Sequence, residues 1–115
     1  MIRLFEAHVR LQDGAAVIDL QGEINAAADQ NLNKAYLEAE QGSPNLIALN
    51  FSGVDYINST GIALIVGLLA QARKTKRRLV VYGLTEHYQE IFRITRLADF
   101  MHMYADETSA LKELS

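Results

Sequence analysis

Two hydroxyl side chains, Ser59 and Thr60, stand between an apolar run typical of a strand and a longer apolar run typical of a helix. Asn58 precedes them and Gly61 follows, so the segment has residue types that begin a helix. A phosphate on either hydroxyl would lie at the positive end of the helix dipole, among N–H groups without intrahelical acceptors. It would add about −1.5 to −2 charges, which the fold tolerates and a docked partner does not. The segment therefore predicts a contact surface controlled by phosphorylation.

The same residues also allow a purely structural interpretation. Asn58, Ser59 and Thr60 are all good capping residues, and each good cap stabilises a helix by about 1 kcal/mol. Composition alone leaves both interpretations open.

Other chemistry has little support in the sequence. The three histidines, His8, His87 and His102, are scattered, and none has a carboxylate or a second histidine at metal-ligand spacing. No phosphate-binding or dinucleotide-binding glycine pattern is present. Residues 57–61 contain a serine but lack the first glycine of a nucleophile elbow. We therefore expect no catalytic residues, no metal, no cofactor and no enzymatic activity.

Composition favours one cytoplasmic domain covering residues 1–115. The chain has no cysteine, which suits a reducing compartment, and its apolar runs are shorter than the roughly 20 residues that span a bilayer, so we expect no direct membrane insertion. A net charge of −3 argues against nucleic acid as the main partner. Residues 73–78 are strongly basic, but cations at a helix C-terminus complement its dipole, and we prefer this interpretation to nucleic-acid or lipid binding.

Hydrophobic periodicity predicts the first half of the fold. Residues 5–12 alternate as a half-buried strand, residues 12–14 form a hairpin turn, and residues 16–21 form a second strand that Gly22 ends. Residues 26–41 form a helix that stops before Pro44, and residues 46–51 form a strand covered on both faces. The buried face of the helix is expected to carry Ala28, Leu32, Ala35, Tyr36 and Ala39.

The second half begins with a loop in which Ser52, Gly53 and Asp55 act as turn residues. A helix follows over residues 60–74, apolar almost all round and so expected to be covered on more than one side. Its predicted stripes are Ile62, Ile65, Val66 and Leu69, with Leu64 and Leu68 beside them, and a small-residue stripe of Ala63, Gly67 and Ala70 that allows weak homodimer formation.

The remaining elements are short. Residues 79–82 form a strand, Thr85 caps a third helix, residues 101–104 are extended, and Asp106 caps a last helix. One face of the third helix is expected to carry Tyr88, Ile91, Phe92 and Thr95. The last helix is expected to pack inward through Ala110, Leu111 and Leu114. The order β-β-α-β-α-β-α-β-α predicts an α/β fold: a mixed sheet with an opening β-hairpin, parallel central strands and about four helices.

The chain resembles the STAS domain family of bacterial anti-sigma-factor antagonists and sulfate-transporter tails over nearly its whole length. The residues that carry the resemblance are Leu20-Gln21-Gly22-Glu23-Ile24-Asn25, Leu49-Asn50-Phe51, Val54, Tyr56-Ile57, Asn58-Ser59-Thr60-Gly61-Ile62, Ala63-Leu64-Ile65-Val66-Gly67, Ile91-Phe92-Arg93, Leu97-Ala98-Asp99-Phe100 and Ala110-Leu111.

The resemblance implies a partner switch. In such antagonists the phosphorylated serine precedes Ser/Thr-Gly, a position that Ser59 occupies here, with Thr60 as the less favoured hydroxyl. The unphosphorylated form binds an anti-sigma factor that is also a serine kinase, phosphorylation causes release, and a serine phosphatase reverses it. The expected partner-binding residues are Asn25, Asp55, Tyr56, Asn58, Ser59, Thr60, Gly61, Ile62 and Leu64.

Two positions depart from the family pattern. Asn58 stands where an acid usually precedes the serine, and Asn25 stands where an acid often ends the second-strand loop. An amide caps a helix as a carboxylate does, but it does not repel a phosphate. It also lacks the negative charge that a kinase or a phosphatase could recognise in an acid. The alternative function is therefore a STAS adapter that is not phosphorylated, in a sensory assembly or in an ABC or lipid transport complex.

Overall fold

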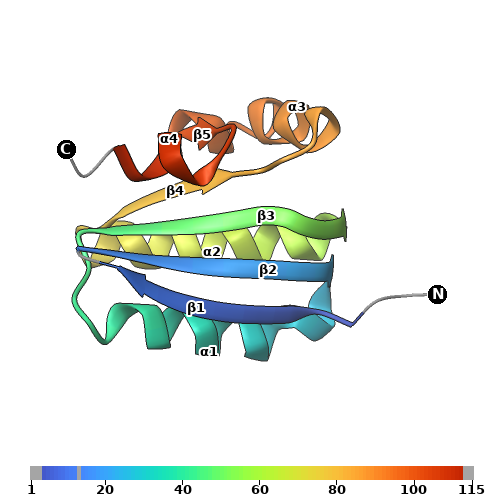
Figure 1. Ribbon diagram of the computed structural model, residues 1–115. Coiled ribbons are helices and arrows are strands. Elements are labelled where there is room, and N and C mark those ends of the chain that lie inside the picture. Colours follow the sequence, from blue (N-terminus) through green and yellow to red (C-terminus); the bar gives the residue numbers. More distant parts are fainter. Residues whose placement is uncertain (1–3, 13, 113–115) are drawn as a thin grey trace.

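A five-stranded sheet is the centre of the molecule (Figure 1). The computed structural model describes residues 4–12 and 14–112. The strands lie side by side in chain order, with the first pair antiparallel and all later pairs parallel. They are β1 (Glu6–Gln12), β2 (Ala15–Ile24), β3 (Leu46–Ile57), β4 (Arg78–Tyr82) and β5 (Met103–Tyr104). The predicted mixed sheet with an opening hairpin and parallel central strands is confirmed.

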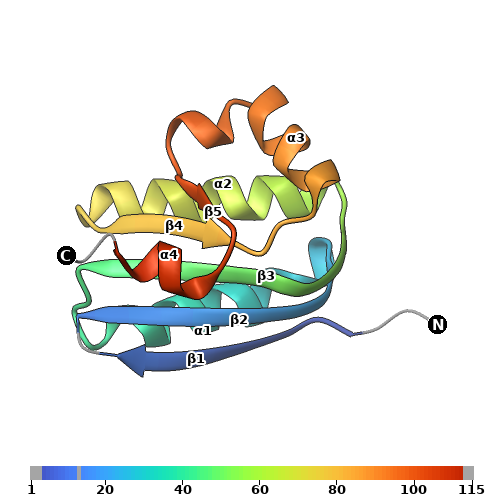
Figure 2. The ribbon, with the colours of Figure 1, turned by 45° about the horizontal axis from the view of Figure 1, so that its top comes forward.

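Helices cover both faces of this sheet (Figure 2). Four α-helices are described, as predicted, together with two short 3₁₀ turns: η1 (Ala26–Ala28), α1 (Asp29–Glu40), α2 (Ser59–Lys74), α3 (Glu86–Ile94), η2 (Leu97–Asp99) and α4 (Glu107–Leu111). Side chains of α1, α2 and α3 share one apolar core with the sheet, while α4 packs on the opposite face through Ala110. Within the described residues, no helix combines the length and apolar character needed to cross a membrane.

Burial follows the predicted pattern in the central strands and in α1. Ile47 and Leu49 of β3 face the larger core, whereas Leu46 and Ala48 face the core under α4, so the strand is covered on both sides. The five residues expected on the inner face of α1 and η1 are all buried. Thr85 and Asp106 cap α3 and α4 as predicted, each accepting a backbone N–H three residues on.

Strands β2 and β3 are longer than predicted. Gly22 does not end β2, which continues to Ile24, and Ser52, Gly53 and Asp55 lie within β3 rather than in a turn. The physical reason is tertiary pairing: the two strands remain paired in parallel to their ends, and shifts of register along the ladder accommodate the turn-forming residues.

The apolar stripes predicted on α2 are only partly buried. Its buried residues are Gly61, Ile65, Leu68, Leu69 and Ala72. Val66 is 45% exposed, and the small residues Ala63, Gly67 and Ala70 are exposed as well. One apolar side of the helix therefore faces solvent. Leu114, which was predicted to pack inward, lies outside the described residues. So does Asp13 in the predicted turn.

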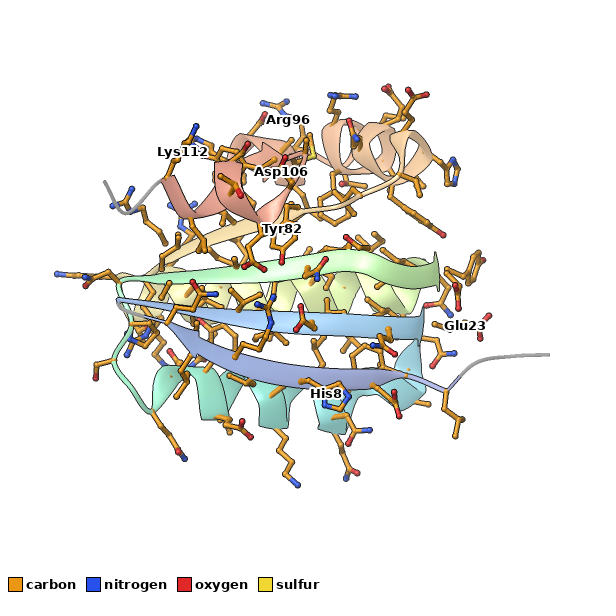
Figure 3. All side chains as sticks on the ribbon, in the orientation of Figure 1. His8, Glu23, Tyr82, Arg96, Asp106 and Lys112 are labelled. Carbon is orange, nitrogen blue, oxygen red and sulfur yellow. The ribbon has the colours of Figure 1, made fainter. Side chains whose placement is uncertain are left out.

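A cluster of polar side chains joins α4 to the sheet. The guanidinium group of Arg10 on β1 donates to Asp19 at 2.6 Å and also to Glu107 of α4. Glu107 in turn accepts a hydrogen bond of 2.7 Å from Tyr82, which Figure 3 labels beneath α4. Asn50 donates to Asp19 at 2.7 Å. Arg10 holds the pKa of both carboxyl groups below their ordinary values.

Candidate functional site

The predicted phosphorylation site lies where β3 passes directly into α2. β3 ends at Ile57 and α2 begins at Ser59, so Asn58 alone joins them. Asn58 has extended backbone angles, and its side-chain oxygen accepts a hydrogen bond of 2.8 Å from the N–H of Gly61. Asn58 is therefore the N-cap, while Ser59 already has a place inside the helix. The structural interpretation in which Ser59 and Thr60 also cap the helix is wrong.

Neither hydroxyl at this junction is used for folding. Ser59 and Thr60 are exposed, and their side chains form no hydrogen bonds with the part of the chain that the structure describes. By helix geometry the first backbone N–H groups of α2 have no intrahelical acceptor, and Asn58 satisfies only that of Gly61. The first turn of α2 contains no acidic residue. The helix dipole at this end of α2 therefore favours an added anion.

The N-terminal end of α2 packs closely against the C-terminal end of β2. The N–H of Asn58 donates to the carbonyl of Ile24 at 3.2 Å. A Cβ atom on Gly61 would lie 2.1 Å from the same carbonyl oxygen and 2.8 Å from Ile57, so only glycine allows this approach. Gly61 is buried, and the neighbour that approaches it closely is β2 of its own chain.

This contact brings the two unusual asparagines to one end of the sheet. Ile24 and Ile57 are partners in the parallel ladder, and Asn25 and Asn58 follow them directly. Asn25 caps η1 by accepting a hydrogen bond of 2.9 Å from the N–H of Ala27. Each amide thus caps one helical segment, a role for which no charge is required.

Two residues at this end of the sheet were not predicted as site residues from the sequence. Glu23 is half-buried and pairs with Tyr56 in the ladder, at the end of β2 marked in Figure 3. Tyr88 of α3 is buried, and its hydroxyl accepts the N–H of Ile57 at 2.9 Å and donates to the carbonyl of Ile57 at 3.4 Å. The sequence placed Tyr88 on the inner face of α3, but nothing in it indicated this bond to a residue 31 positions away.

The remaining predicted partner residues come from the strand ends and the first turns of α2. Asp55 is exposed and Tyr56 is 51% exposed at the end of β3, while Ile62 and Leu64 are half-buried on α2. We call the group the Ser59 surface: Asn25, Asp55, Tyr56, Asn58, Ser59, Thr60, Gly61, Ile62 and Leu64. All of them come from the ends of β2 and β3 or from the first two turns of α2, and Gly61 alone among them is buried.

Comparison with known proteins gives the same assignment as the fold. Residues 6–110 match the family model described as STAS domain. The chain belongs to the STAS domain family. The resemblance seen in the sequence is confirmed.

Relatives of this STAS domain include anti-sigma-B factor antagonists. That of Staphylococcus aureus is 28% identical over 92 residues, which cover 80% of this chain and 85% of the relative. That of Staphylococcus epidermidis is 28% identical over 86 residues, which cover 75% of this chain and 80% of the relative.

Solved structures share the STAS fold. An anti-sigma factor antagonist from Mycobacterium paratuberculosis superimposes with a TM-score of 0.82 at 20% identity, over 96% of this chain and 93% of the other. The phosphorylated form of the Bacillus cell fate determinant SpoIIAA superimposes with a TM-score of 0.72 at 21% identity, over 97% of this chain and 100% of the other.

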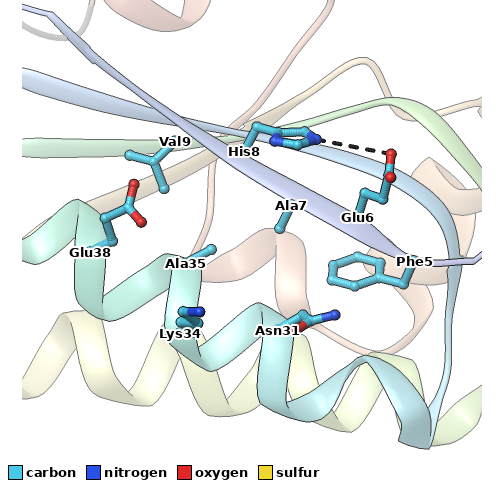
Figure 4. A pocket seen from close by; sticks show the side chains of 9 residues that line it. All are labelled: Phe5, Glu6, Ala7, His8, Val9, Asn31, Lys34, Ala35 and Glu38. Atoms are coloured by element: carbon cyan, nitrogen blue, oxygen red, sulfur yellow. Dashed lines mark ion pairs between the residues drawn. The ribbon is translucent and has the colours of Figure 1, made fainter.

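Cavities near to and far from the Ser59 surface of this STAS domain differ greatly in size. The small cavity beside it, between Val54, Leu84 and Tyr88, has a volume of about 10 Å³, the least that a single water molecule needs. A larger groove of about 440 Å³ lies between β1 and α1, where Phe5, Ala7 and Val9 face α1 (Figure 4).

Proposed function

We propose that this protein is an anti-sigma-factor antagonist that acts as a phosphorylation-controlled partner switch, with Ser59 as the modified residue. The unphosphorylated form binds an anti-sigma factor that is also a serine kinase. Phosphorylation releases it, and a serine phosphatase restores binding. The observation that carries the proposal is the exposed hydroxyl of Ser59 at the first residue of α2, left unused because Asn58 supplies the cap. The names of the relatives, anti-sigma-B factor antagonists, support the same role.

The proposed switch works through charge rather than refolding. A phosphate carries about −1.5 to −2 charges at pH 7. Within the chain it would meet the positive end of α2 and the neutral amide of Asn58, so the fold accepts it. A partner seated on Tyr56, Ile62 and Leu64 would have to desolvate the same charge or place its own groups against it. Binding is therefore the equilibrium that phosphorylation changes.

Phosphate mapping tests the site. The purified protein is incubated with ATP and the serine kinase encoded nearest its gene, and the products are analysed by mass spectrometry. We expect one phosphate on Ser59, none on the Ser59→Ala variant, and normal modification of the Thr60→Ala control. Phosphate on Thr60 in the parent, or equal modification of Ser59→Ala, contradicts the assignment.

A second measurement separates the effect of negative charge at residue 59 from the effect of side-chain size. Ser59→Asp should weaken kinase binding by about 1–3 kcal/mol, while Ser59→Asn, of nearly the same size but neutral, should weaken it far less. Calorimetry of both variants with the kinase gives the comparison. Equal losses for Asp and Asn would attribute the effect to side-chain size and reject the charge mechanism.

A STAS adapter that is not phosphorylated is the second candidate. Asn58 and Asn25 favour it, because these amides offer a kinase or phosphatase no acid to recognise. Such an adapter would use the Ser59 surface unmodified, in a sensory assembly or an ABC or lipid transport complex. Genes for a kinase and a phosphatase nearby favour the switch, and a permease operon favours the adapter.

A further inference from the structure

Strand β1 forms one edge of the sheet, and among the described residues it has no neighbour on its outer side (Figure 2). It is seven residues long, whereas β5 at the opposite edge has two. Natural edge strands are commonly protected from further pairing by proline, lysine or a bulge. β1 contains neither residue type, and its pairing with β2 runs from Glu6 to Gln12 without a shift of register. This edge is therefore long, regular and open to another strand.

The hairpin geometry determines which backbone groups of β1 point outward. Gln12 and Ala15 are partners with only two residues between them, so they form a hydrogen-bonded pair of the antiparallel ladder. Such pairs alternate along a strand, so the even-numbered residues of β1 turn their N–H and C=O groups toward β2. The odd-numbered residues turn theirs away from the sheet, and no backbone bond from elsewhere in the described chain reaches them. The outward groups belong to Ala7, Val9 and Leu11.

The side chains beside this edge leave room for a further strand. A groove of about 440 Å³ lies between β1 and α1, with Phe5, Ala7 and Val9 on its apolar wall (Figure 4). Lys34 and Glu38 of α1 line the same groove, and both are exposed. Neither side chain forms an ion pair or a hydrogen bond with the part of the chain that the structure describes. The groove therefore offers an apolar wall and two opposite charges that folding does not use.

The edge is complementary to a second copy of itself. An added strand needs apolar side chains on the face toward α1 and polar side chains on the other face, an alternation that β1 itself has. We propose that two copies of this chain pair antiparallel through the outer edges of β1, with His8 on the two-fold axis. The two sheets then continue into one. The proposal is independent of the modification of Ser59.

This register satisfies both the backbone and the side chains. Phe5 of one copy lies opposite Leu11 of the other, and Ala7 lies opposite Val9, so the outward N–H and C=O groups meet as hydrogen-bonded pairs. Leu11, which is 66% exposed in the single chain, gains an aromatic cross-strand neighbour. All nine described residues of 4–12 find an opposite residue in this register.

The charges of the groove are also self-complementary. The two-fold axis brings the grooves of both copies together on the same face of the joined sheet. A surface that carries one cation and one anion can then place Lys34 of one copy beside Glu38 of the other, in two equivalent pairs. Arg10 is not needed for this, because Asp19 and Glu107 already hold its guanidinium group on the face toward α4.

Cysteine cross-linking tests the register, because the chain contains no cysteine of its own. The two copies of His8 form a non-hydrogen-bonded pair with Cα atoms about 4.5 Å apart, a separation that a disulfide can join. Each Glu6 lies four residues from its counterpart, about 13 Å, which is too far. His8→Cys should therefore form a linked dimer under mild oxidation, and Glu6→Cys, which is similarly exposed on the same face, should not. Equal linking of the two variants overturns the proposal.

Sedimentation equilibrium measures the dimer without a cross-link. The mass should rise reversibly with concentration from 12.8 kDa toward twice that value. Ala7→Pro removes an outward N–H group but no hydrogen bond within the chain, so the variant should fold, as circular dichroism verifies. Its dimer dissociation constant should rise by about tenfold or more. Leu11→Lys should have the same effect, because it places a cation on the edge.

Val66→Lys is the control for another dimer surface, since Val66 is 45% exposed beside the small residues of α2. It should leave the dissociation constant unchanged. Dissociation caused by Val66→Lys but not by Leu11→Lys overturns the proposal and assigns the dimer to α2. A parent protein that remains monomeric up to about 1 mM also overturns it, and leaves the edge to an extended segment of a different protein.

Discussion

Gly61 and Gly67 lie six residues apart on α2 and have opposite surroundings. A methyl group at Gly61 would collide with the carbonyl oxygen of Ile24, whereas no atom lies within 4 Å of the position that a methyl group at Gly67 would occupy. Gly61→Ala should therefore lower the free energy of unfolding by about 2 kcal/mol or more. Gly67→Ala should raise it by up to about 1 kcal/mol, because alanine is the better helix former. Urea unfolding of the two variants, each against the parent, gives both values. A stabilised Gly61→Ala would show that β2 does not hold the helix start in place.

Residue types alone predicted where α2 begins to within one position, but not which side chain caps it. Asn58, Ser59 and Thr60 are nearly equivalent caps, so local chemistry does not choose among them. The choice follows from the end of β3, which is fixed by its pairing with β2 at Ile24 and Ile57. That pairing joins residues far apart in sequence, and it is what leaves the hydroxyl of Ser59 available.

At the level of elements, α3 braces the junction between β3 and α2 through Tyr88. Tyr88→Phe should lower the free energy of unfolding by about 1–3 kcal/mol, because the N–H of Ile57 loses its acceptor in a buried setting. Amide exchange at Ile57 should also become faster. Both are measured on the same sample, by urea unfolding and by hydrogen-exchange NMR.

Tyr56→Phe is the control for this brace. Tyr56 is 51% exposed on the neighbouring position of β3, so removing its hydroxyl should change stability little. If Tyr88→Phe leaves exchange at Ile57 unchanged, α3 does not fix the junction.

Periodicity predicted the type and order of the main elements because each has a face that must be buried. It underestimated β2 and β3, since Gly22, Ser52, Gly53 and Asp55 are turn formers when judged locally. In the molecule these residues lie in a parallel ladder with shifted register, and the pairing outweighs their propensity. The Ser59 surface depends on those additional strand residues, so its shape could not be derived from local pattern.

At the scale of the whole molecule, the cluster of Arg10, Asp19 and Glu107 joins the first strand to the last helix. Hydrogen bonds from Arg10 hold the pKa of Asp19 and the pKa of Glu107 below the ordinary values of these side chains. A lowered carboxyl pKa contributes stability that is present above the ordinary value and is lost as the pH falls through the folded-state value. The protein should therefore lose stability below about pH 4.5.

Arg10→Met tests this link. At pH 7 the variant should unfold at lower urea concentration than the parent, and the difference should narrow as the pH is lowered from about 5 to 3. Arg93→Met, which removes an exposed pair with Glu90, should show little difference at any pH. A difference between Arg10→Met and the parent that stays constant with pH would contradict the assignment.

Asn58 is the only residue between β3 and α2, so the connection between strand and helix has no spare length. Inserting one residue there would turn the helix by about 100° about its axis and carry the serine to another side of the molecule. Side chains around this serine can therefore be exchanged without moving it, whereas a change in the length of this connection would displace it. Natural diversity at this joint should be confined to substitutions, and engineered sensors that need a spacer should place it elsewhere in the chain.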